Sequence, residues 1–466
     1  MEAVYVIIGG GIAGISCIEA ISLLDESASI ILISATPFVK AVTHINPLTK
    51  MLAEFSVEEK PFDYISSMFP SVNVVIDSAI KIDPVQRTVT TSTNKIVNYQ
   101  KLCICTGASP KMIATDCDHV FGIRDIDSAK QLEEKLKDAK RIMVVGNGGI
   151  ATELIYEIEG VEIIWAIKDK HISATFIDPG AAEFFQDRLV QKDKDAAATV
   201  VKTVKYTVGE GEGTKCTGAA LGPHWHDRIN LIAKNNASKI TVEYEVEVSR
   251  VKFHGEDGEN WPVYVELTNG KTVGCNFVVS ATGVIPNSET ISIVNGTFDL
   301  AEDKGIKVNS LMETNLPNIY AAGDVCSASW PTACHWFQMR LWTQARQMGS
   351  YAGRCMVESK RGEETIVDFC FEMFTHVTRF FGYKVILLGL FNAQNLDRNY
   401  ELLLRVTKKN EYIKLVVSDG KIQGAVLIGD TDLEEMCENL ILNQLNVSEF
   451  GEDLLNPDID IEDYFD

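Results

Sequence analysis

A glycine-rich turn near the start of the chain has the residue types and spacing that bind a dinucleotide. An apolar run at 4–8 ends in Gly9-x-Gly11-x-x-Gly14, and apolar residues at helical spacing follow it. In a strand–turn–helix unit, Gly9 would make the tight turn and Gly11 would let the backbone approach a pyrophosphate. Gly14 would allow close packing of helix on strand, and the helix N-terminus would add N–H donors and a positive dipole. The stretch therefore predicts a nucleotide-binding βαβ unit.

A second turn of the same kind follows an apolar run at 141–145. Its pattern is Gly146-x-Gly148-x-x-Ala151, in which alanine at the third position is a standard variant. The strand expected at 161–165 ends without an acid and is followed by Lys168. A carboxylate there would favour NAD, whereas a basic residue can pair with the 2′-phosphate of NADP. The pattern slightly favours NADPH and leaves both nicotinamide nucleotides open, because Lys168 is equally typical of a solvated loop.

The adenosine end of the first site departs from the usual pattern. An acid usually ends the second strand of such a unit and holds a ribose hydroxyl. Here Ser34 follows the apolar run at 30–33, and its hydroxyl can make the same bond more weakly. Lys40 lies within reach of the same pocket, where a cofactor contact and a solvated loop lysine are equally good interpretations.

The cysteines do not form a pattern for disulphide or metal chemistry. Eleven are scattered along the chain, and C-x-x-C does not occur. Cys103 and Cys105 point to the same side of an expected strand, and buried core thiols are the favoured interpretation. His224 and His226 have no cysteine or acidic cluster nearby to complete a metal site. We therefore expect reduced thiols and no bound metal.

Further turns after apolar strands complete the series of motifs. They are Thr106-Gly107, Ala281-Thr282-Gly283 and Gly323-Asp324. The Asp324 carboxylate can accept a hydrogen bond from a flavin ribityl hydroxyl, and Gly323 gives the backbone room to approach. A helix expected at 336–356 would bring its N-terminus toward the flavin ring. The amphipathic segment 43–69 is expected to be helical in part.

In this order the motifs resemble the pyridine nucleotide-disulphide oxidoreductase superfamily of FAD enzymes, over roughly residues 3–355. The resemblance implies FAD and NAD(P)H as cofactors. It implies FAD contacts from Gly9, Gly11, Gly14, Thr106, Gly107, Gly323 and Asp324. It implies a nicotinamide-nucleotide site at Gly146, Gly148 and Glu153. Neighbouring positions complete the predicted cofactor contacts: Ile12, Ala13, Ser34, Lys40, Gly149, Ile150, Lys168 and Gly283.

One departure from the family pattern concerns the chemistry. Disulphide reductases of this superfamily carry a cysteine pair, whereas the corresponding segment 41–47 contains none. A dithiol–disulphide relay is therefore not expected. The catalytic residues stay unassigned, with His44 and His376 as weak candidates. His376 lacks the His-Pro-Thr context of the family, so a buried core histidine is the favoured interpretation.

The predicted fold is α/β, with two Rossmann-like dinucleotide-binding domains and a C-terminal α+β domain. The FAD domain is expected to be discontinuous, at 1–120 and 288–355. It would enclose an NAD(P) domain at 121–287 with an insertion around 180–240. The C-terminal domain is expected at 360–466 and ends in an acidic tail at 458–466, which is either solvated or a docking segment.

Composition limits the partners. A net charge of −22 over 466 residues argues against general binding to nucleic acid or membrane surfaces, which need a basic face. No apolar run is long enough to span a bilayer, and the first expected strand leaves no room for a targeting peptide. We expect a cytoplasmic protein that is also compatible with the nucleus.

Two functions fit these observations. The first is an FAD-dependent oxidoreductase that oxidises NAD(P)H and passes electrons to oxygen or another acceptor. The second is a flavoprotein whose redox state controls binding to another protein, with little turnover. The family resemblance implies slow NAD(P)H oxidation, together with association with a tRNA ligase complex that it protects from oxidation. The rate of turnover without a partner separates the two functions.

Overall fold

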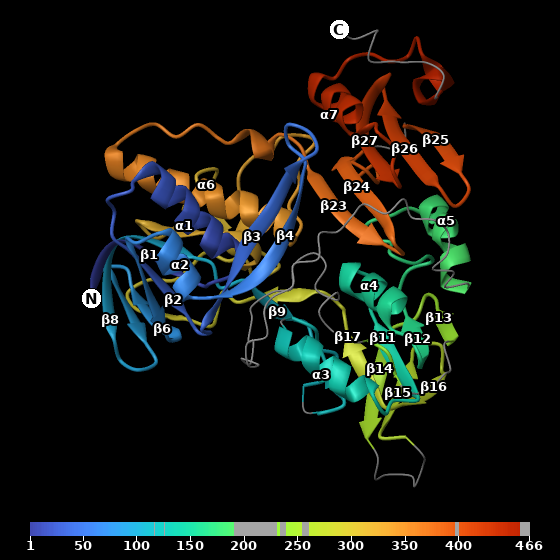
Figure 1. Cartoon of the computed structure of the whole chain (residues 1–466), viewed down its shortest axis with the longest axis horizontal. Helices are drawn as coiled ribbons and strands as arrows, with labels where there is room; N and C mark the ends of the chain where they lie inside the picture. Colours follow the sequence, from blue (N-terminus) through green and yellow to red (C-terminus); the bar gives the residue numbers. More distant parts are fainter. Residues whose placement is uncertain are drawn as a thin grey trace.

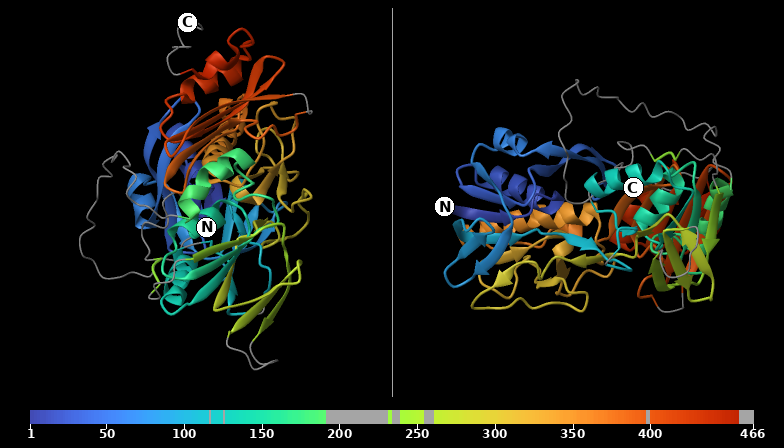
Figure 2. Two further views of the ribbon diagram at one scale, coloured as in Figure 1. Left: turned by 90° about the vertical axis from the view of Figure 1, so that its right-hand side faces the viewer. Right: turned by 90° about the horizontal axis from the view of Figure 1, so that it is seen from below.

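The computed structural model describes residues 1–115, 117–124, 126–190, 231–233, 239–253, 261–396 and 400–456. Within these ranges the chain forms three domains, each built on its own main sheet (Figure 1). The first domain forms one lobe, and the second and C-terminal domains lie together beside it (Figure 2). His224, His226, most of the insertion predicted at 180–240 and the tail at 458–466 lie outside the described ranges.

The first domain is built on an eight-stranded sheet. Its strands pair in the order β19-β6-β7-β8-β1-β2-β5, and β21 pairs with the far end of β8. The strands β5, β2, β1, β8 and β21 run parallel. The central strands β1 and β2 have long apolar runs because both faces of the sheet are covered there. The strands are β1 (Glu2–Ile8), β2 (Ile30–Ser34), β5 (Val72–Ile76), β6 (Ala79–Asp83), β7 (Thr88–Thr91), β8 (Ile96–Ile104), β19 (Ser292–Ile293) and β21 (Ile319–Ala321).

Two helices from opposite ends of this domain's sequence pack side by side on the sheet. They are α1 (Ile12–Leu24) and α6 (Trp342–Arg361), shown in blue and orange in Figure 1. A Cβ at Gly349 would lie 2.2 Å from the Ala13 carbonyl oxygen, and one at Gly353 would lie 2.5 Å from the Cys17 carbonyl oxygen. The two glycines therefore set how closely the helix backbones approach.

Helix α6 starts later than the predicted 336–356. Two glutamine side chains instead form hydrogen bonds with the backbone before the helix. The Gln338 amide accepts from the Ala328 N–H at 2.7 Å and donates to the Cys326 carbonyl oxygen at 2.9 Å. Gln344 likewise accepts from the Met339 N–H at 2.8 Å. These bonds hold the stretch before Trp342 in an extended loop, which apolar periodicity alone does not reveal.

The segment 43–69, expected to be helical in part, has one short helix, and most of its length is a two-stranded ribbon. The strands β3 (Phe38–Pro47) and β4 (Ala53–Pro61) pair antiparallel, and only α2 (Asp63–Met68) is helical. At the ribbon's tip, Glu438 of the C-terminal domain accepts from the Thr49 hydroxyl and from the Lys50 N–H at 3.1 Å. The ribbon therefore reaches across to the C-terminal domain.

The second domain contains a parallel sheet in the order β10-β17-β11-β12-β13 and an antiparallel sheet β14-β15-β16. The sharp turn before β16 is the Asn269-Gly270 pair, where Gly270 has φ +84°. The strands are β10 (Val120–Phe121), β11 (Arg141–Val145), β12 (Glu162–Ala166), β13 (Lys239–Glu243), β14 (Val248–Phe253), β15 (Val263–Leu267), β16 (Thr272–Cys275) and β17 (Phe277–Ser280). The helices are α3 (Ile126–Leu136), α4 (Gly149–Glu157) and α5 (Pro179–Val190).

The C-terminal domain is a five-stranded antiparallel sheet in the order β23-β24-β27-β26-β25 with helix α7 packed against it (Figure 1). Buried Lys414 on β26 bonds to Asp178 of the second domain at 2.6 Å. The elements are β23 (Thr375–Phe380), β24 (Tyr383–Gly389), β25 (Glu401–Thr407), β26 (Glu411–Ser418), β27 (Lys421–Ile428) and α7 (Glu434–Asn443). Short elements complete the fold: β9 (Ala108–Pro110), β18 (Val284–Pro286), β20 (Ile306–Val308), β22 (Cys326–Ala328), η2 (Gly323–Val325), η3 (Phe369–Phe371) and η4 (Gly451–Leu455). Across the described ranges, no helix is long and apolar enough to cross a membrane.

Candidate functional site

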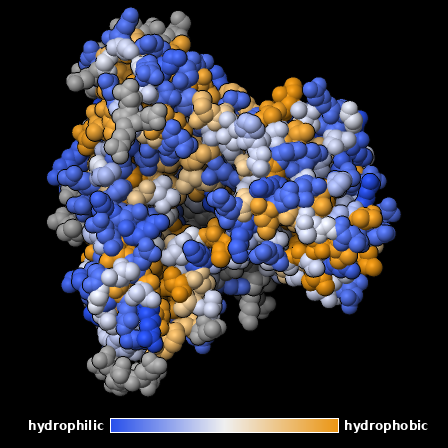
Figure 3. All heavy atoms as spheres, turned by 180° about the vertical axis from the view of Figure 1, so that it is seen from behind, coloured by the Kyte–Doolittle hydropathy of each residue, from blue (hydrophilic) through white to orange (hydrophobic). Residues whose placement is uncertain are grey.

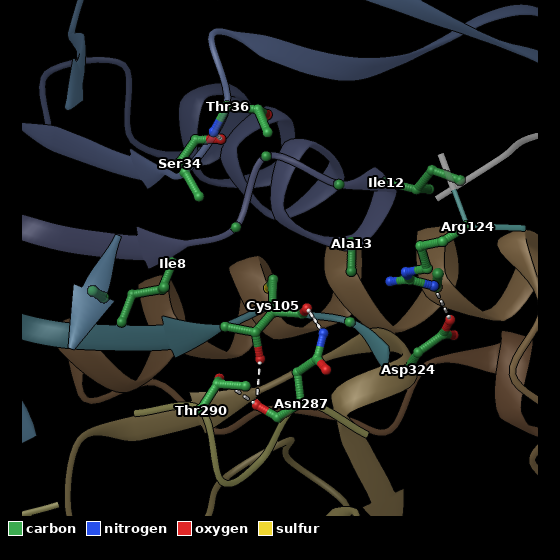
Figure 4. Close-up of a pocket in the computed structure, with 18 of the residues that line it drawn as sticks. Ile8, Ile12, Ala13, Ser34, Thr36, Cys105, Arg124, Asn287, Thr290 and Asp324 are labelled. Atoms are coloured by element: carbon green, nitrogen blue, oxygen red, sulfur yellow. Dashed lines mark hydrogen bonds and ion pairs between the residues drawn. The ribbon is translucent and has the colours of Figure 1, made fainter. Parts of the chain in front are cut away.

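A cavity of about 520 Å³ lies at the carboxyl ends of the parallel strands of the first domain. This is where open α/β sheets bind ligands, because the loops that follow neighbouring strands diverge there. Figure 4 shows the turn between Ile8 and Ile12 above Cys105, and Figure 3 shows the surface hollowed between the two lobes. Nine of the predicted contact residues line the cavity, together with Gly10, which was not predicted: Gly9, Gly11, Ile12, Ala13, Ser34, Thr106, Gly107, Ile150 and Asp324.

The three glycines of the first turn are held for different reasons. Gly9 has φ +115°, and a Cβ there would lie 2.2 Å from the Cys105 carbonyl oxygen. A Cβ at Gly14 would lie 1.9 Å from the Gly9 carbonyl oxygen, so packing alone excludes a side chain at both positions. Gly11 is the N-cap of α1 with extended backbone (φ −74°, ψ −179°), and a Cβ there would meet nothing within 4 Å. Neither the backbone nor the protein's packing requires glycine at this position, and the space above it is open to a ligand.

The adenosine end of the cavity is polar but has no carboxylate on β2. Ser34 and Thr36 line it, and the Thr36 N–H lies 3.4 Å from the Ser34 hydroxyl oxygen. Asp77 also lines this end, but its carboxylate accepts hydrogen bonds from the hydroxyls of Ser92 and Thr93. The Ser92 bond is the main reason that the pKa of Asp77 lies well below its usual range. Asp77 therefore holds its own loop and leaves Ser34 as the hydroxyl nearest the glycine turn.

Asn287 locks the Thr106–Gly107 turn into the cavity wall. Its side-chain amide donates to the Thr106 carbonyl oxygen at 2.9 Å, and its backbone N–H donates to the Gly107 carbonyl oxygen at 2.9 Å. In return, the Thr106 hydroxyl donates to the Asn287 carbonyl oxygen at 3.1 Å (Figure 4). The two crossings between domains, one at Thr106 and one at Asn287, thus form a single rigid unit.

Two arginines that the sequence reasoning missed also line the cavity. Arg124 lies 3.9 Å from the Asp324 carboxylate, and Arg340 donates from Nε to the Asp324 carbonyl oxygen at 2.8 Å. Burial raises the pKa of the Asp324 carboxyl, and the charges of both arginines oppose that shift. A guanidinium beside a glycine turn is well suited to a pyrophosphate. Because Arg124 comes from the loop after β10, far from either glycine motif in sequence, no local pattern indicated it.

The cysteines near the cavity are unsuited to redox work. Cys105 lines the cavity, and its sulfur lies 3.5 Å from that of Cys103. Both thiols are buried, as expected. The Cys103 thiol and burial raise the pKa of Cys105 well above its usual range. The thiolate is the reactive form of cysteine, so a raised pKa disfavours redox reactivity of this pair.

Several predicted residues lie away from this cavity. Lys40 is buried and forms an ion pair with Glu59 at 2.6 Å. Gly323 packs against Ala13. Gly14 packs against the Gly9 carbonyl oxygen of the first turn. His44 sits on the β3–β4 ribbon with an exposed side chain. His376 is fully buried, 3.0 Å from the Thr343 hydroxyl, and burial lowers its pKa to about 3.

The second glycine turn repeats the geometry of the first. Gly146 has φ +126°, with a Cβ site 2.1 Å from the Ala281 carbonyl oxygen, whereas Gly148 caps α4 in extended conformation with nothing within 4 Å of its Cβ site. Gly283 is similarly open, and Gly149 faces Phe176. Glu153 is half-buried on α4.

An acid that the sequence reading overlooked stands beside this second turn. Asn147 donates from its amide to Asp169 at 2.8 Å and accepts from the Ser173 N–H at 2.5 Å. The strand β12 does end without an acid, but the loop that follows curls back so that Asp169 meets the turn. Lys168 is exposed next to it. A carboxylate and an ammonium therefore both flank the expected ribose position.

The residues present fit a bound FAD. The open space at Gly11, the N-terminus of α1 and the Arg124 guanidinium match a pyrophosphate. Trp342 and Ala345, in the first turn of α6, also line the cavity. No cluster of metal-ligating side chains occurs in the part of the chain that the structure describes.

The chain belongs to the pyridine nucleotide-disulphide oxidoreductase family, whose model matches residues 4–349. Residues 377–445 match the rubredoxin NAD+ reductase C-terminal domain. These matches confirm both the family resemblance and the predicted α/β fold class with its C-terminal domain.

Named relatives and solved structures agree with this assignment. Pyridine nucleotide-disulfide oxidoreductase domain-containing protein 1 from Homo sapiens is 48% identical over 99% of this chain and 98% of that protein. A ferredoxin reductase from Rhodopseudomonas palustris shares the fold at a TM-score of 0.69 and 18% identity, over 99% of both chains. A water-forming NADH oxidase from Lactobacillus brevis does so at a TM-score of 0.66 and 16% identity, over 96% of this chain and 92% of that one.

Proposed function

We propose that this chain is an FAD-dependent oxidoreductase that oxidises NAD(P)H and passes electrons to oxygen or another acceptor without a redox-active cysteine pair. The observation that carries the proposal is the convergence of two dinucleotide turns on one cavity. The cavity begins at Gly11 of the first turn and is also lined by Ile150, two residues beyond Gly148 of the second. Cofactors bound at the two turns would thus approach each other.

Bound FAD would supply the redox chemistry, taking two electrons from the reduced nicotinamide and giving them to an acceptor. The chain's own residues would bind the cofactor and orient it in the cavity. Gly11 and Arg124 would hold the pyrophosphate, and Asp324 would accept from a ribityl hydroxyl. Asn287 keeps the Thr106–Gly107 turn in place.

The positions of the cysteines indicate whether thiols could take part in electron transfer. The pair Cys103 and Cys105 is buried, and segment 41–47 contributes His44 but no cysteine. We therefore assign neither thiol a role in storing electrons beside a bound cofactor. The named neighbours include a ferredoxin reductase and a water-forming NADH oxidase, so both a small redox protein and oxygen are acceptors to test.

The test is anaerobic reduction of the purified, flavin-loaded protein by NADH and NADPH, followed by absorbance. Bleaching in the wild type and none in Gly148→Val, with flavin retained, is the expected result. Reduction of Gly148→Val at the wild-type rate would place the nicotinamide site elsewhere.

The choice of nicotinamide is tested at the two charges beside the second turn. Lys168→Glu should weaken binding of NADPH more than that of NADH, because the ammonium can pair only with a 2′-phosphate. Asp169→Asn should weaken NADH selectively, since a carboxylate binds the free ribose hydroxyl. Equal effects on both nucleotides in both variants would contradict this assignment.

A regulatory function is the alternative. In it, the reduced and oxidised forms bind a protein partner differently and turnover is slow. From the family resemblance we propose a tRNA ligase complex as that partner and the cytoplasm and nucleus as its location. Rapid NAD(P)H consumption without partner would favour the metabolic enzyme. Redox-dependent co-purification of the ligase, together with imaging of the tagged chain, would support the regulatory function.

A further inference from the structure

Cys334 differs from the other cysteines that the structure describes. It is exposed, whereas those on the main sheets and helices are buried and two more, Cys117 and Cys370, are partly covered. Its sulfur lies 3.1 Å from Nδ1 of His335. The pair sits in the loop between β22 and α6, where the His335 carbonyl oxygen accepts from the Phe374 N–H at 2.9 Å. The thiol therefore lies where the first domain meets the C-terminal domain.

The imidazole beside this thiol is held in one orientation. His335 is buried, and its Nε2 lies 2.9 Å from the Gln423 side-chain oxygen and 3.4 Å from the Gln444 amide nitrogen. Gln444 already donates to the carbonyl oxygens of Ile422 at 2.9 Å and Ile441 at 2.8 Å, which uses both of its N–H groups.

The tautomer of His335 follows from these bonds. Gln423 offers an oxygen at the shorter distance, so Nε2 carries the proton and donates it there. Nδ1 is left with a lone pair toward the sulfur and can accept the thiol proton. A nucleophile, a base within hydrogen-bond reach and a third group that orients the base are the parts of an activated thiol.

We propose that Cys334 is a peroxide-sensitive modification site, with His335 as its base and Gln423 as the group that orients the base. The sulfur attacks one oxygen of hydrogen peroxide, and an S–O bond forms as the O–O bond breaks. The thiol proton passes through His335 to the departing hydroxide, which leaves as water. The sulfur loses the two electrons that the peroxide gains, and the product is a sulfenic acid. This step is independent of the proposed flavin chemistry.

Cys117 provides a matched control within the same chain. It is a partly exposed thiol with a histidine two residues away, but the His119 ring bonds to the Asn276 carbonyl oxygen at 3.1 Å. The Cys117 sulfur accepts from the His119 backbone N–H at 3.2 Å. Cys117 therefore has an imidazole nearby, but the ring nitrogen of His119 bonds elsewhere and does not contact the thiol.

The experiment treats the full-length protein with hydrogen peroxide in the presence of dimedone and measures adducts by peptide mapping. Peptide mapping also separates Cys216, which lies outside the described ranges. We expect labelling of Cys334 about tenfold or more faster than that of Cys117, in line with a positioned general base. His335→Asn, which keeps a polar group of similar reach but removes the base, should lower the Cys334 rate by a similar factor and leave Cys117 unchanged.

Gln423→Glu tests the orienting group without removing the imidazole. A carboxylate behind Nε2–H makes the ring a stronger base, so Cys334 should label faster than in the wild type. Equal rates at Cys334 and Cys117 in the wild type would overturn the proposal. If His335→Asn fails to fold, an unchanged Cys334 rate in Gln423→Glu would overturn it as well.

Discussion

A valine at Gly11 should separate the folding of the first domain from its ability to bind FAD. The Gly11 backbone is extended, with φ −74° and ψ −179°, and no protein atom lies within 4 Å of the Cβ site. The cost to the fold is that of exchanging a glycine N-cap for an apolar residue, about 1 kcal/mol. The same side chain fills the space that a pyrophosphate needs. Gly14→Ala is the contrasting variant, because its Cβ would lie 1.9 Å from the Gly9 carbonyl oxygen and should disrupt the fold itself.

The assay combines flavin occupancy, from the ratio of visible to ultraviolet absorbance, with thermal unfolding at added FAD. A ligand at a thousandfold excess over its Kd stabilises the native state by about 4 kcal/mol, and a hundredfold loss of affinity removes about 2.7 kcal/mol of this. With that loss of affinity, Gly11→Val should keep only about 1.4 kcal/mol of the stabilisation, so added FAD should raise its unfolding temperature about a third as much as that of the wild type. Gly148→Val serves as the matched control, since it is equally open and should keep its flavin. Full occupancy in Gly11→Val would refute the assignment of this turn to FAD.

Three other predictions concern a charged cofactor contact, the protonation of a buried histidine and the number of electrons taken up. Arg124→Gln should weaken FAD binding by about 1.5–3 kcal/mol, or roughly ten- to a hundredfold in Kd, because it removes a charge-assisted contact; equilibrium dialysis with an unchanged Kd would contradict this. The pKa of His376 is about 3 in the folded chain and 6.5 ordinarily, so below pH 6.5 the unfolded chain binds the extra proton and stability falls, by about 2 kcal/mol at pH 5. His376→Gln should flatten that part of the curve of unfolding free energy against pH. Anaerobic titration with dithionite should take two electrons per flavin, and an uptake of four would show that a cysteine pair of this chain stores electrons after all.

The sequence was most informative where all the residues that form a turn and its ligand site lie in one short stretch of the chain. Gly9, Gly11 and Gly14 lie within six positions, so their spacing alone predicts the turn, the helix and the open phosphate position. The parallel strands were equally clear, because burial on both faces demands continuous apolar runs. These two signals were sufficient to predict the α/β class.

Residues that reach the cavity through tertiary structure were missed. Arg124 enters from the loop after β10, and Asp169 reaches the second turn because Asn147 draws its loop back. Segment 43–69 does contain the partial helix expected of it, but its amphipathic pattern does not reveal the pairing between β3 and β4. The start of α6 was misplaced because Gln338 bonds to backbone atoms of β22, which lie outside the helix.

The packing of α6 on α1 has a consequence for how the chain is made. During synthesis, β1 and α1 leave the ribosome early, but β21 and α6, which complete their layer, are synthesised only after the whole second domain. The second domain is a continuous insert, one of its two core clusters is formed by residues of its own sheets between Val120 and Val278, and domains generally fold as units as they emerge. It should therefore fold while the α1 surface that later receives Gly349 and Gly353 is still bare. The first domain, whose synthesis begins first, is therefore completed after the second domain. A chain that stops before β21 should expose the uncovered face of α1, which chaperones would bind and through which the chain would aggregate.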